Sequence, residues 1–326
     1  MTREPVIRLA LAGDTMLGRR VARTIAHTKA APVAAEVVAV AAEADLFVLN
    51  LECSISDRGE RWPEPGKPFF FRAPPLAADL LAEIGVDCVT LANNHALDYG
   101  PQALLDTFDH LRAAGVTWVG AGADVVAARQ ARVLVAGDLR LALLGASDHP
   151  PEYSAAADRC GIAYADLRAR PWHGWLFDAV AAARNDADAV LVLPHWGPNM
   201  TARPLPYIRR AARALLAAGA ALVAGHSAHV VHGAGPGVLY DLGDFVDDYA
   251  VHPALRNDLG LLFLVELDAH GPRSLEAVPL KLDFCHTRLA TGDDATWIRR
   301  RFVDACAELG TTAVERGDRV VADLQQ

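Results

Sequence analysis

Short apolar runs rich in Val, Leu and Ile alternate along the chain with Ala-, Leu- and Arg-containing segments of helical period. Runs that are apolar almost throughout are typical of strands buried on both faces, and the segments between them have the periodicity of helices that cover a sheet. The alternation therefore predicts an α/β fold. Strands are expected at 6–13, 45–52, 86–93, 116–122, 140–147, 188–197, 221–226, 237–244, 259–268 and 276–284. Helices are expected at 33–44, 75–84, 101–114, 174–186, 204–218 and 294–309.

The balance of charged and apolar residues hardly changes along the 326 residues, and the sequence shows neither an internal repeat nor a low-complexity linker. A chain of this length suits either one large α/β domain or two smaller ones. The even composition favours one domain, which we place at residues 1–285. A C-terminal helical extension, 286–326, is expected to pack on the same domain.

Hydrophobic residues make up 52% of the chain and charged residues 22%, and the formal net charge is −9. This composition is globular, and the negative charge argues against a nucleic-acid partner. The start, MTREPVIRLALAGD, makes a poor signal peptide, and no uninterrupted apolar segment approaches the length that spans a bilayer. We therefore expect no membrane anchor and a cytoplasmic location. The five scattered cysteines form no CxxC pair and are expected to be reduced thiols.

Polar side chains follow several of the predicted strands at the point where each strand ends. In open α/β sheets the ligand site lies beyond the carboxyl ends of the strands, so these side chains are expected to meet at one rim. They are Asp14, then Asn50 and Glu52, then Asn93, Asn94 and His95, then His195, then His226 and His229, and finally Asp241 and Asp244.

Each of these residues has a structural explanation when it is taken alone. Asp14 is placed to cap a helix, Asn93 and Asn94 are common turn residues, and His195 suits a hydrogen-bonded structural role. Independent caps and turns, however, give no reason for acid or amide groups after some strands and histidine after others. The set as a whole therefore favours a shared site.

Imidazole and carboxylate donors without cysteine suit a divalent metal ion such as Mn, Fe or Zn. The donors are numerous enough for two metal ions that share a bridging group. Such a pair activates a water molecule and commonly serves phosphate ester cleavage. Arg19, close to the start of a helix, is a candidate for binding a phosphate or carboxylate group, the alternative being an exposed helix arginine. Asn50 and Asn93 complete the candidate substrate-binding residues.

The chain also resembles a known family in several ordered blocks. In their order and approximate spacing the blocks resemble the CapA family, bacterial proteins linked to poly-γ-glutamate capsule synthesis, whose domain is related to the calcineurin-like metallophosphoesterases. The resemblance covers about residues 6–250 and extends toward 285. The blocks are LAGDTMLGR, NLECSIS, FRAPP, TLANNHALDYG, LPHWG, AGHSAHVVHG and YDLGDFVDD.

This resemblance implies a four-layer α/β/β/α sandwich of metallophosphoesterase type over residues 1–285, with a dinuclear metal site at the strand ends. His95 is similar to the histidine that contacts the substrate phosphate or protonates the leaving group, which makes it the candidate catalytic residue. Glu52 stands in the position of the bridging carboxylate. The positions that match metal ligands of the family are Asp14, Glu52, Asn94, His195, His226 and His229.

The chain departs from the family pattern at a few positions. The wider phosphoesterases carry a histidine where this chain has Met16, so one metal ion is short of a ligand. Asn50 or a water molecule is expected to fill the gap, or only one position binds a metal ion tightly. Asn199 stands where the family often has an acidic residue. The family block GNF reads GDF here because of Asp244, which is either a further metal ligand or a solvated loop acid. His232 has no counterpart in the motif and is expected at the rim or in a solvated loop.

The sequence therefore predicts a metal-dependent phosphatase or phosphoesterase that hydrolyses a small anionic metabolite with a metal-activated water. One alternative is an accessory or binding protein of poly-γ-glutamate-type polymer synthesis. Another is a binuclear hydrolase of amide or isopeptide bonds, since a metal pair polarises a carbonyl as well as a phosphoryl group.

Overall fold

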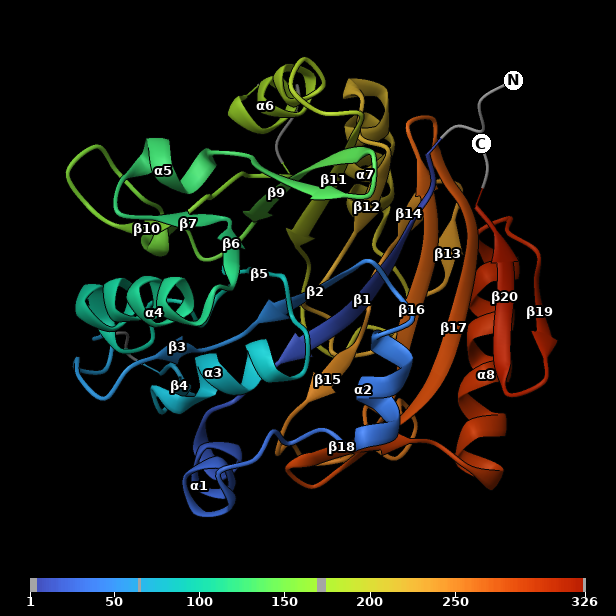
Figure 1. Ribbon diagram of the computed structural model, residues 1–326, viewed down its shortest axis with the longest axis horizontal. Coiled ribbons are helices and arrows are strands. Elements are labelled where there is room, and N and C mark those ends of the chain that lie inside the picture. Colours follow the sequence, from blue (N-terminus) through green and yellow to red (C-terminus); the bar gives the residue numbers. More distant parts are fainter. Residues whose placement is uncertain (1–4, 64–65, 169–173, 325–326) are drawn as a thin grey trace.

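The two main β-sheets are seen in a computed structural model that describes residues 5–63, 66–168 and 174–324 (Figure 1). The larger sheet is built around β1. Its strand order is β19–β20–β17–β16–β1–β2–β5–β6, and β15 also pairs with β1 and β18 with β17. The strands β1, β2, β5 and β6 are parallel, whereas β16, β17 and β20 run antiparallel to their neighbours. The bounds are β1 (Ile7–Thr15), β2 (Leu46–Leu51), β5 (Cys88–Thr90), β6 (Thr117–Val119), β15 (Asp244–Val246), β16 (Leu259–Asp268), β17 (Gly271–Asp283), β18 (His286–Leu289), β19 (Ala313–Arg316) and β20 (Arg319–Asp323).

The smaller sheet has the order β13–β14–β12–β11–β9–β8, with parallel pairing from β14 through β9. Its bounds are β8 (Arg132–Ala136), β9 (Leu139–Ser147), β11 (Ala189–His195), β12 (Leu222–Ala224), β13 (Ala234–Gly235) and β14 (Val238–Leu239). Short separate pairs are formed by β3 (Ser54–Ile55) with β4 (Arg72–Ala73) and by β7 (Ala121–Gly122) with β10 (Gly161–Ile162).

The two sheets pack face to face because their central strands are apolar on both sides. Side chains alternate between the faces of a strand, so Leu9 and Leu191 enter the core between the sheets, while Ala10 and Val192 face the outer helices. The outer face of the larger sheet is covered by α1 to α4, and that of the smaller sheet by α6 and α7. The predicted α/β/β/α sandwich is confirmed. The helices are α1 (Arg19–Thr28), α2 (Ala35–Ala41), α3 (Leu76–Glu83), α4 (Gly100–Ala114), α5 (Val125–Arg129), η1 (Pro151–Tyr153), α6 (Trp175–Ala183), α7 (Pro206–Ala218) and α8 (Gly292–Glu308).

The C-terminal segment is not helical throughout. It contains α8, but β18 and the hairpin β19–β20 pair with β17 and extend the larger sheet. Figure 1 shows α8 lying beside β17 and β20. Phe302 of α8 enters the core between the sheets, where its ring lies 5.6 Å from the ring of Phe263. The boundary predicted at 285 falls in the turn between β17 and β18, two strands that are hydrogen-bonded to each other.

The segment predicted as one strand at 237–244 divides between the two sheets. Its first part, β14, pairs with β12 in the smaller sheet, whereas β15 pairs with β1 in the larger one. The carbonyl of Gly243, in the turn between them, accepts a hydrogen bond from the backbone N–H of Asp14 at 2.8 Å. A Cβ on Gly13 would lie 1.9 Å from that carbonyl oxygen, so only glycine fits at position 13. This crossing ties the two sheets together at the end of β1.

Several elements have no counterpart among the predicted ranges, helix α1 and strand β8 among them. A helix start was expected close to Arg19, but α1 buries only Val21 and Ile25, too sparse a pattern to predict its range. Strand β8 lies at an edge of the smaller sheet and has exposed apolar residues, Val133 and Val135, so it lacks the fully apolar run of the central strands. Among the described residues, no helix is both long enough and apolar enough to cross a bilayer.

If α8 is part of the main core, replacing Phe302 with Ala lowers the free energy of unfolding by about 3–5 kcal/mol, because a buried aromatic ring is lost. Urea unfolding followed by far-UV circular dichroism and tryptophan fluorescence measures this loss. Leu105→Ala, at a site that is 37% exposed on α4, is the matched control and is expected to cost about 0.5 kcal/mol. A separate early transition for α8 in the wild-type protein would contradict the prediction.

Candidate metal centre

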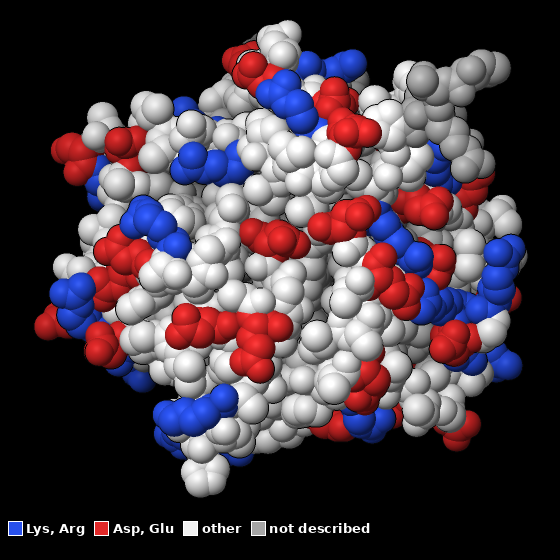
Figure 2. Space-filling model, viewed as in Figure 1, with Lys and Arg blue, Asp and Glu red and all other residues white. Residues whose placement is uncertain are grey.

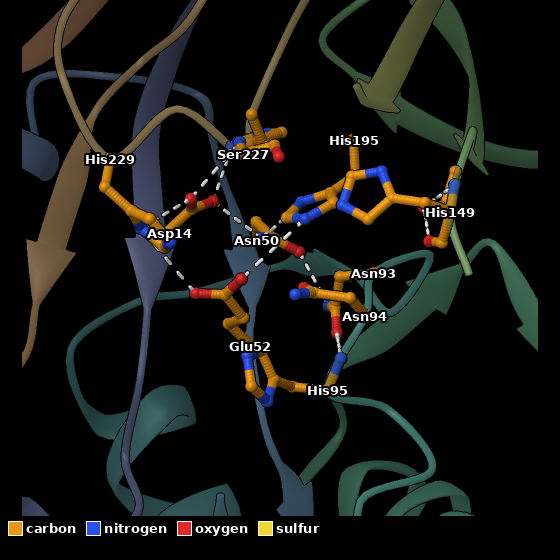
Figure 3. A network of polar contacts seen from close by, with 12 residues as sticks. Asp14, Asn50, Glu52, Asn93, Asn94, His95, His149, His195, Ser227 and His229 are labelled. Atoms are coloured by element: carbon orange, nitrogen blue, oxygen red, sulfur yellow. Dashed lines mark hydrogen bonds and ion pairs between the residues drawn. The ribbon is translucent and has the colours of Figure 1, made fainter. Parts of the chain in front are cut away.

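The carboxyl ends of the parallel strands of both sheets meet at one rim, and the predicted donor residues lie there. Asp14 ends β1, His195 ends β11, and His226 follows β12. A backbone bridge between His195 and His226 holds the ends of the two strands in the smaller sheet together. Figure 3 shows side chains from both sheets pointing toward one another at this rim. The structure thus brings together groups that are far apart in the sequence.

Asp14 lies at the middle of the cluster and contacts both sheets. Its Oδ1 accepts a hydrogen bond from Asn50 Nδ2 at 2.7 Å, and its Oδ2 accepts one from the backbone N–H of Ser227 at 3.2 Å. Nδ1 of His226 lies 3.4 Å from Oδ1, and Nδ1 of His229 lies 3.3 Å from Oδ2. Burial alone would raise the pKa of Asp14, but the neighbouring imidazole of His226 and the charge of His229 outweigh it and hold the pKa below its usual range.

Glu52 is fully buried, and among the described residues neither of its carboxylate oxygens has a hydrogen-bond partner. Its Oε1 lies 3.8 Å from Nε2 of His195, and its Oε2 lies 4.0 Å from Nδ1 of His229. Burial, together with the nearby charge of Asp14, raises the pKa of Glu52 well above its usual value. Burial lowers the pKa of His195 well below its usual value, although the charge of Asp14 opposes this.

Other polar atoms at the rim are equally buried and, within the described ranges, equally without a hydrogen-bond partner. They are Asn94 Oδ1, His195 Nε2, both ring nitrogens of His226, and Asp244 Oδ2. Burying a polar atom without a partner costs about 1–3 kcal/mol, and a charged one costs more. So many such atoms facing one another are typical of a site that binds a cation.

Two groups of donor atoms, each within 4.8 Å of one another, fit such cations: Asp14 with Glu52 and His195, and Asp14 with His229 and Asp244. Asp14 belongs to both groups. The residue types, carboxylate and imidazole without thiolate, are those that bind Mn, Fe or Zn. The residues present therefore fit the binding of divalent metal ions.

The loop that carries the two histidines has an unusual backbone. Ser227 has a φ of +108° and His229 a φ of +57°, in the region that L-residues with a side chain rarely adopt. Ser227 is held there by its backbone hydrogen bond to Asp14 and by its hydroxyl, which donates to the carbonyl of Gly197 at 2.8 Å. Such strain, about 1–3 kcal/mol per residue, is found mainly at functional sites, where the surrounding contacts hold it.

His95 lies beside the donor cluster and forms a pair with Asp98. Its Nδ1 lies 2.6 Å from Oδ2 of Asp98, which also accepts a hydrogen bond from the backbone N–H of Phe71 at 2.7 Å. The other oxygen of Asp98 lies 3.1 Å from Nζ of Lys67 and 3.2 Å from the hydroxyl of Tyr153. Burial lowers the pKa of His95 more than Asp98 raises it. The contact of Nδ1 with Asp98 thus fixes the orientation of the ring.

A cleft of about 510 Å³ opens beside His95 and His229. Arg19 lies at its wall, with its guanidinium 5.2 Å from the ring of Phe69 and its Nε 3.4 Å from Oδ1 of Asp248. Arg19 thus lies at the wall of a cleft that His95 and His229 also line, and its role in substrate binding stays a prediction. Other lining residues are Phe71, Asn199, Met200 and Tyr249.

Asn50 and Asn93, predicted to bind substrate, are both fully buried and use their amides within the protein. The Nδ2 group of Asn93 donates to Oδ1 of Asn50 at 2.9 Å and to the carbonyl of Leu51 at 2.8 Å. Oδ1 of Asn93 accepts from the backbone N–H of His95 at 3.0 Å. These contacts position Asp14 and His95, and the substrate-binding role of the two asparagines stays a prediction.

The comparisons with known proteins agree with this arrangement. Residues 8–249 match the family described as bacterial capsule synthesis protein PGA_cap. This chain belongs to that family. The resemblance to the CapA family, stated from the sequence blocks, is thereby confirmed.

Two relatives of this chain have names that refer to polymer synthesis. A probable polyglutamine synthesis accessory protein of Mycobacterium tuberculosis is 32% identical over 292 residues, which cover 85% of this chain and 76% of that protein. The PGA biosynthesis protein CapA of Bacillus subtilis is 26% identical over 285 residues, which cover 86% of this chain and 72% of that protein. A solved structure of a hypothetical protein from Thermus thermophilus is 15% identical, with a TM-score of 0.52 over 85% of this chain and 100% of that one. The last similarity shows the fold alone.

Two residues that the family motifs did not single out also lie at the centre. Asp98 follows His95 by three positions in the block TLANNHALDYG, and that spacing within a quoted block was the available signal. His149 lies with its ring 5.2 Å from the ring of His195, and its Nδ1 is 2.5 Å from Oδ1 of Asp148 (Figure 3). It follows β9, so the strand-end rule, applied to the predicted strand 140–147, would have found it.

His232 and Asp241 lie apart from the donor cluster. His232 is only 3% exposed, and its Nε2 donates to the carbonyl of Thr201 at 2.8 Å, so it is not the solvated loop residue that was one of the two expectations. Asp241 accepts hydrogen bonds from the backbone N–H groups of Ala228 at 2.8 Å and Gly243 at 2.9 Å. It therefore holds the loops that carry the donors.

Charged side chains of both signs are interspersed over the face shown in Figure 2, and its described residues form no continuous basic surface there.

Burial lowers the pKa of His232 from 6.5 to about 4, so this imidazole stays neutral in the folded protein while it becomes charged in the unfolded chain. Its contribution to stability is therefore lost as the pH falls from about 6.5 toward 4. The loss is about 2 kcal/mol at pH 5. Urea unfolding at pH 8 and pH 5, at constant ionic strength, is expected to show a smaller difference for His232→Gln than for the wild type. Equal differences for the two proteins would disprove the assignment.

Proposed function

We propose that this protein is a metal-dependent hydrolase that cleaves a phosphoester of a small anionic molecule in the synthesis of a poly-γ-glutamate-type polymer. The observation that carries the proposal is the convergence of buried donor atoms without hydrogen-bond partners in the described structure, above all both oxygens of Glu52 and Nε2 of His195. A scaffold without a ligand would lose the free energy of desolvating these groups without compensation.

The residues expected to hold two divalent ions are Asp14, Glu52, Asn94, His195, His226, His229 and Asp244. When bound, such ions supply an activated water molecule and positive charge for the oxyanion that forms. The protein's own part is to fix these donors, mainly through Asn50 and Ser227, which hold Asp14 in place. The cleft then admits the substrate to the centre and limits its size.

His95 is the residue that exchanges a proton with the substrate in this proposal. Asp98 holds Nδ1, so Nε2 is the ring atom left to contact the leaving group. Because Asp98 itself is held by Phe71, Tyr153 and Lys67, the imidazole keeps one orientation. A fixed acid–base group of this kind contributes about 10²–10⁴-fold to a rate.

The role in polymer synthesis rests on the names of the family and its members. The family is described as a capsule synthesis protein, and the two relatives are a probable polyglutamine synthesis accessory protein and a PGA biosynthesis protein. An accessory enzyme that hydrolyses a small intermediate satisfies both the names and the buried donors. A binding protein with a vestigial site satisfies only the names, because it leaves the donors unexplained.

Protein purified without chelator is expected to carry stoichiometric divalent metal and to hydrolyse p-nitrophenyl phosphate or its diester. His195→Ala is expected to lower kcat/KM by at least about 100-fold, because one donor at the centre is lost. Elemental analysis and assays with p-nitrophenyl phosphate, its diester and γ-glutamyl peptides measure this. Arg300→Ala, on the exposed side of α8, is the control that keeps activity.

Each contrary result has its own meaning. Cleavage of γ-glutamyl peptides alone would replace the phosphoester with an amide bond as the target. Capture of amide ligase partners without any hydrolysis would favour the binding-protein alternative. Absence of metal, together with full activity of His195→Ala, would refute a metal-dependent hydrolase.

Asp98→Asn is expected to lower kcat by about 10–100-fold while the metal content stays unchanged, because the amide no longer fixes the tautomer of His95. Asp109→Asn, an exposed acid on α4, is the matched control and keeps wild-type kcat. Steady-state kinetics with parallel metal analysis separates the two roles. If Asp98→Asn loses metal in proportion to activity, Asp98 supports the metal centre and not His95.

A further inference from the structure

The metal position nearest the end of β1 lacks the imidazole that the wider phosphoesterases have at position 16. Met16 is fully buried in the outer core, and its Sδ accepts a hydrogen bond from the backbone N–H of Gly18 at 3.0 Å. A thioether committed to such contacts is a poor ligand for Mn, Fe or Zn in an oxygen and nitrogen site. Another group must therefore complete the position.

Asp244 lies where that missing ligand is needed. It is the register partner of Asp14 in the parallel pairing of β15 with β1, so the two carboxylates stand side by side at the rim. Asp244 is 2% exposed, and its Oδ2 has no hydrogen-bond partner in the part of the chain that the structure describes. With Asp14 and His229 it forms one of the two donor groups within 4.8 Å.

An alternative role for Asp244 is to orient His229 from behind, as carboxylates often do for metal-binding histidines. That role requires Nδ1 to face Asp244 while the other ring nitrogen faces the metal ion. Here Nδ1 of His229 is the atom on which three carboxylates converge: Asp244 Oδ1 at 2.7 Å, Asp14 Oδ2 at 3.3 Å and Glu52 Oε2 at 4.0 Å. Asp244 thus lies on the same side of the ring as the other donors, where a ligand belongs.

We infer that Asp244 is a metal ligand in place of the missing histidine, and that the two metal positions therefore prefer different ions. The position of Asp14, Asp244 and His229 is rich in carboxylate, which suits Mn²⁺. The other position has Glu52 and His195 beside Asp14, and His226, whose backbone pairs with that of His195 and whose ring nitrogens have no hydrogen-bond partner in the described structure, adds a second imidazole there, which suits Zn²⁺ or Fe²⁺. This inference rests on the metal-dependent function proposed above.

The test is a metal titration of chelator-treated full-length protein, with Mn²⁺ and Zn²⁺ added separately and together. Bound ions are measured by elemental analysis after gel filtration, and bound Mn²⁺ also by electron paramagnetic resonance. With both ions present, the wild type is expected to bind one of each. Asp244→Asn is expected to weaken Mn²⁺ binding at least about tenfold and to leave the tighter Zn²⁺ site intact, because one charged oxygen donor is lost.

Two further variants keep the result interpretable. Asp106→Asn removes a buried acid of α4 that belongs to neither donor group, and it is expected to keep wild-type Mn²⁺ binding. Asp244→His restores an imidazole donor and is expected to shift that position from Mn²⁺ toward Zn²⁺. Circular dichroism confirms that each variant is folded.

The contrary outcomes are distinct. If the wild type binds two ions and Asp244→Asn keeps both Mn²⁺ affinity and selectivity, the inference is overturned while the proposed function stands. If two equal Zn²⁺ ions displace all Mn²⁺ from the wild type, the difference between the positions is overturned. If the wild type binds neither ion, both the inference and the proposed function fail.

Discussion

The hydrogen bonds to the carboxylate of Asp14 connect the two sheets at the rim where the strands end. The carboxylate receives a hydrogen bond from Asn50 in the larger sheet and one from the loop that follows β12 in the smaller sheet. The backbone of the same residue is held by Gly243, where the chain crosses between the sheets. Because the carboxylate is buried and charged, these contacts cannot loosen without a large desolvation cost, so they fix the strand ends relative to each other.

Much of the fold, and the neighbourhood of the site, follow from the sequence because a buried parallel strand has a distinctive apolar run and a definite end. His195 and Glu52 lie together for that reason. Asp244 could not be assigned from pattern, because 237–244 reads as one strand although the chain leaves one sheet and joins the other within it. Asp98 lies in a loop, and its role depends on a side-chain distance. The contacts of Asn93 with Asn50 and His95 could not be predicted either, since turn and ligand asparagines look alike until their partners are known.

The cleft and the net charge of the molecule affect how strongly a polyanion or a small anion is attracted to it. Arg19 shares its charge with Asp248, and aromatic rings form much of the wall around it. The chain as a whole carries a net charge of −9. A long polyanion gains little attraction from such a surface. The small molecule with one anionic group that is proposed as the substrate meets less of this repulsion than a polyanion does.

The crossing of the chain between its sheets also determines when the site exists. During synthesis Asp14 and Glu52 leave the ribosome well before His195, and Asp244 emerges last of these four. An N-terminal intermediate has carboxylates without their imidazole neighbours, so it holds at most a loose, incomplete set of ligands. The full set of donors comes together only when the smaller sheet has formed and β15 has returned to β1. The crossing thus makes completion of the proposed metal site depend on the joining of the two sheets, late in the folding of the chain.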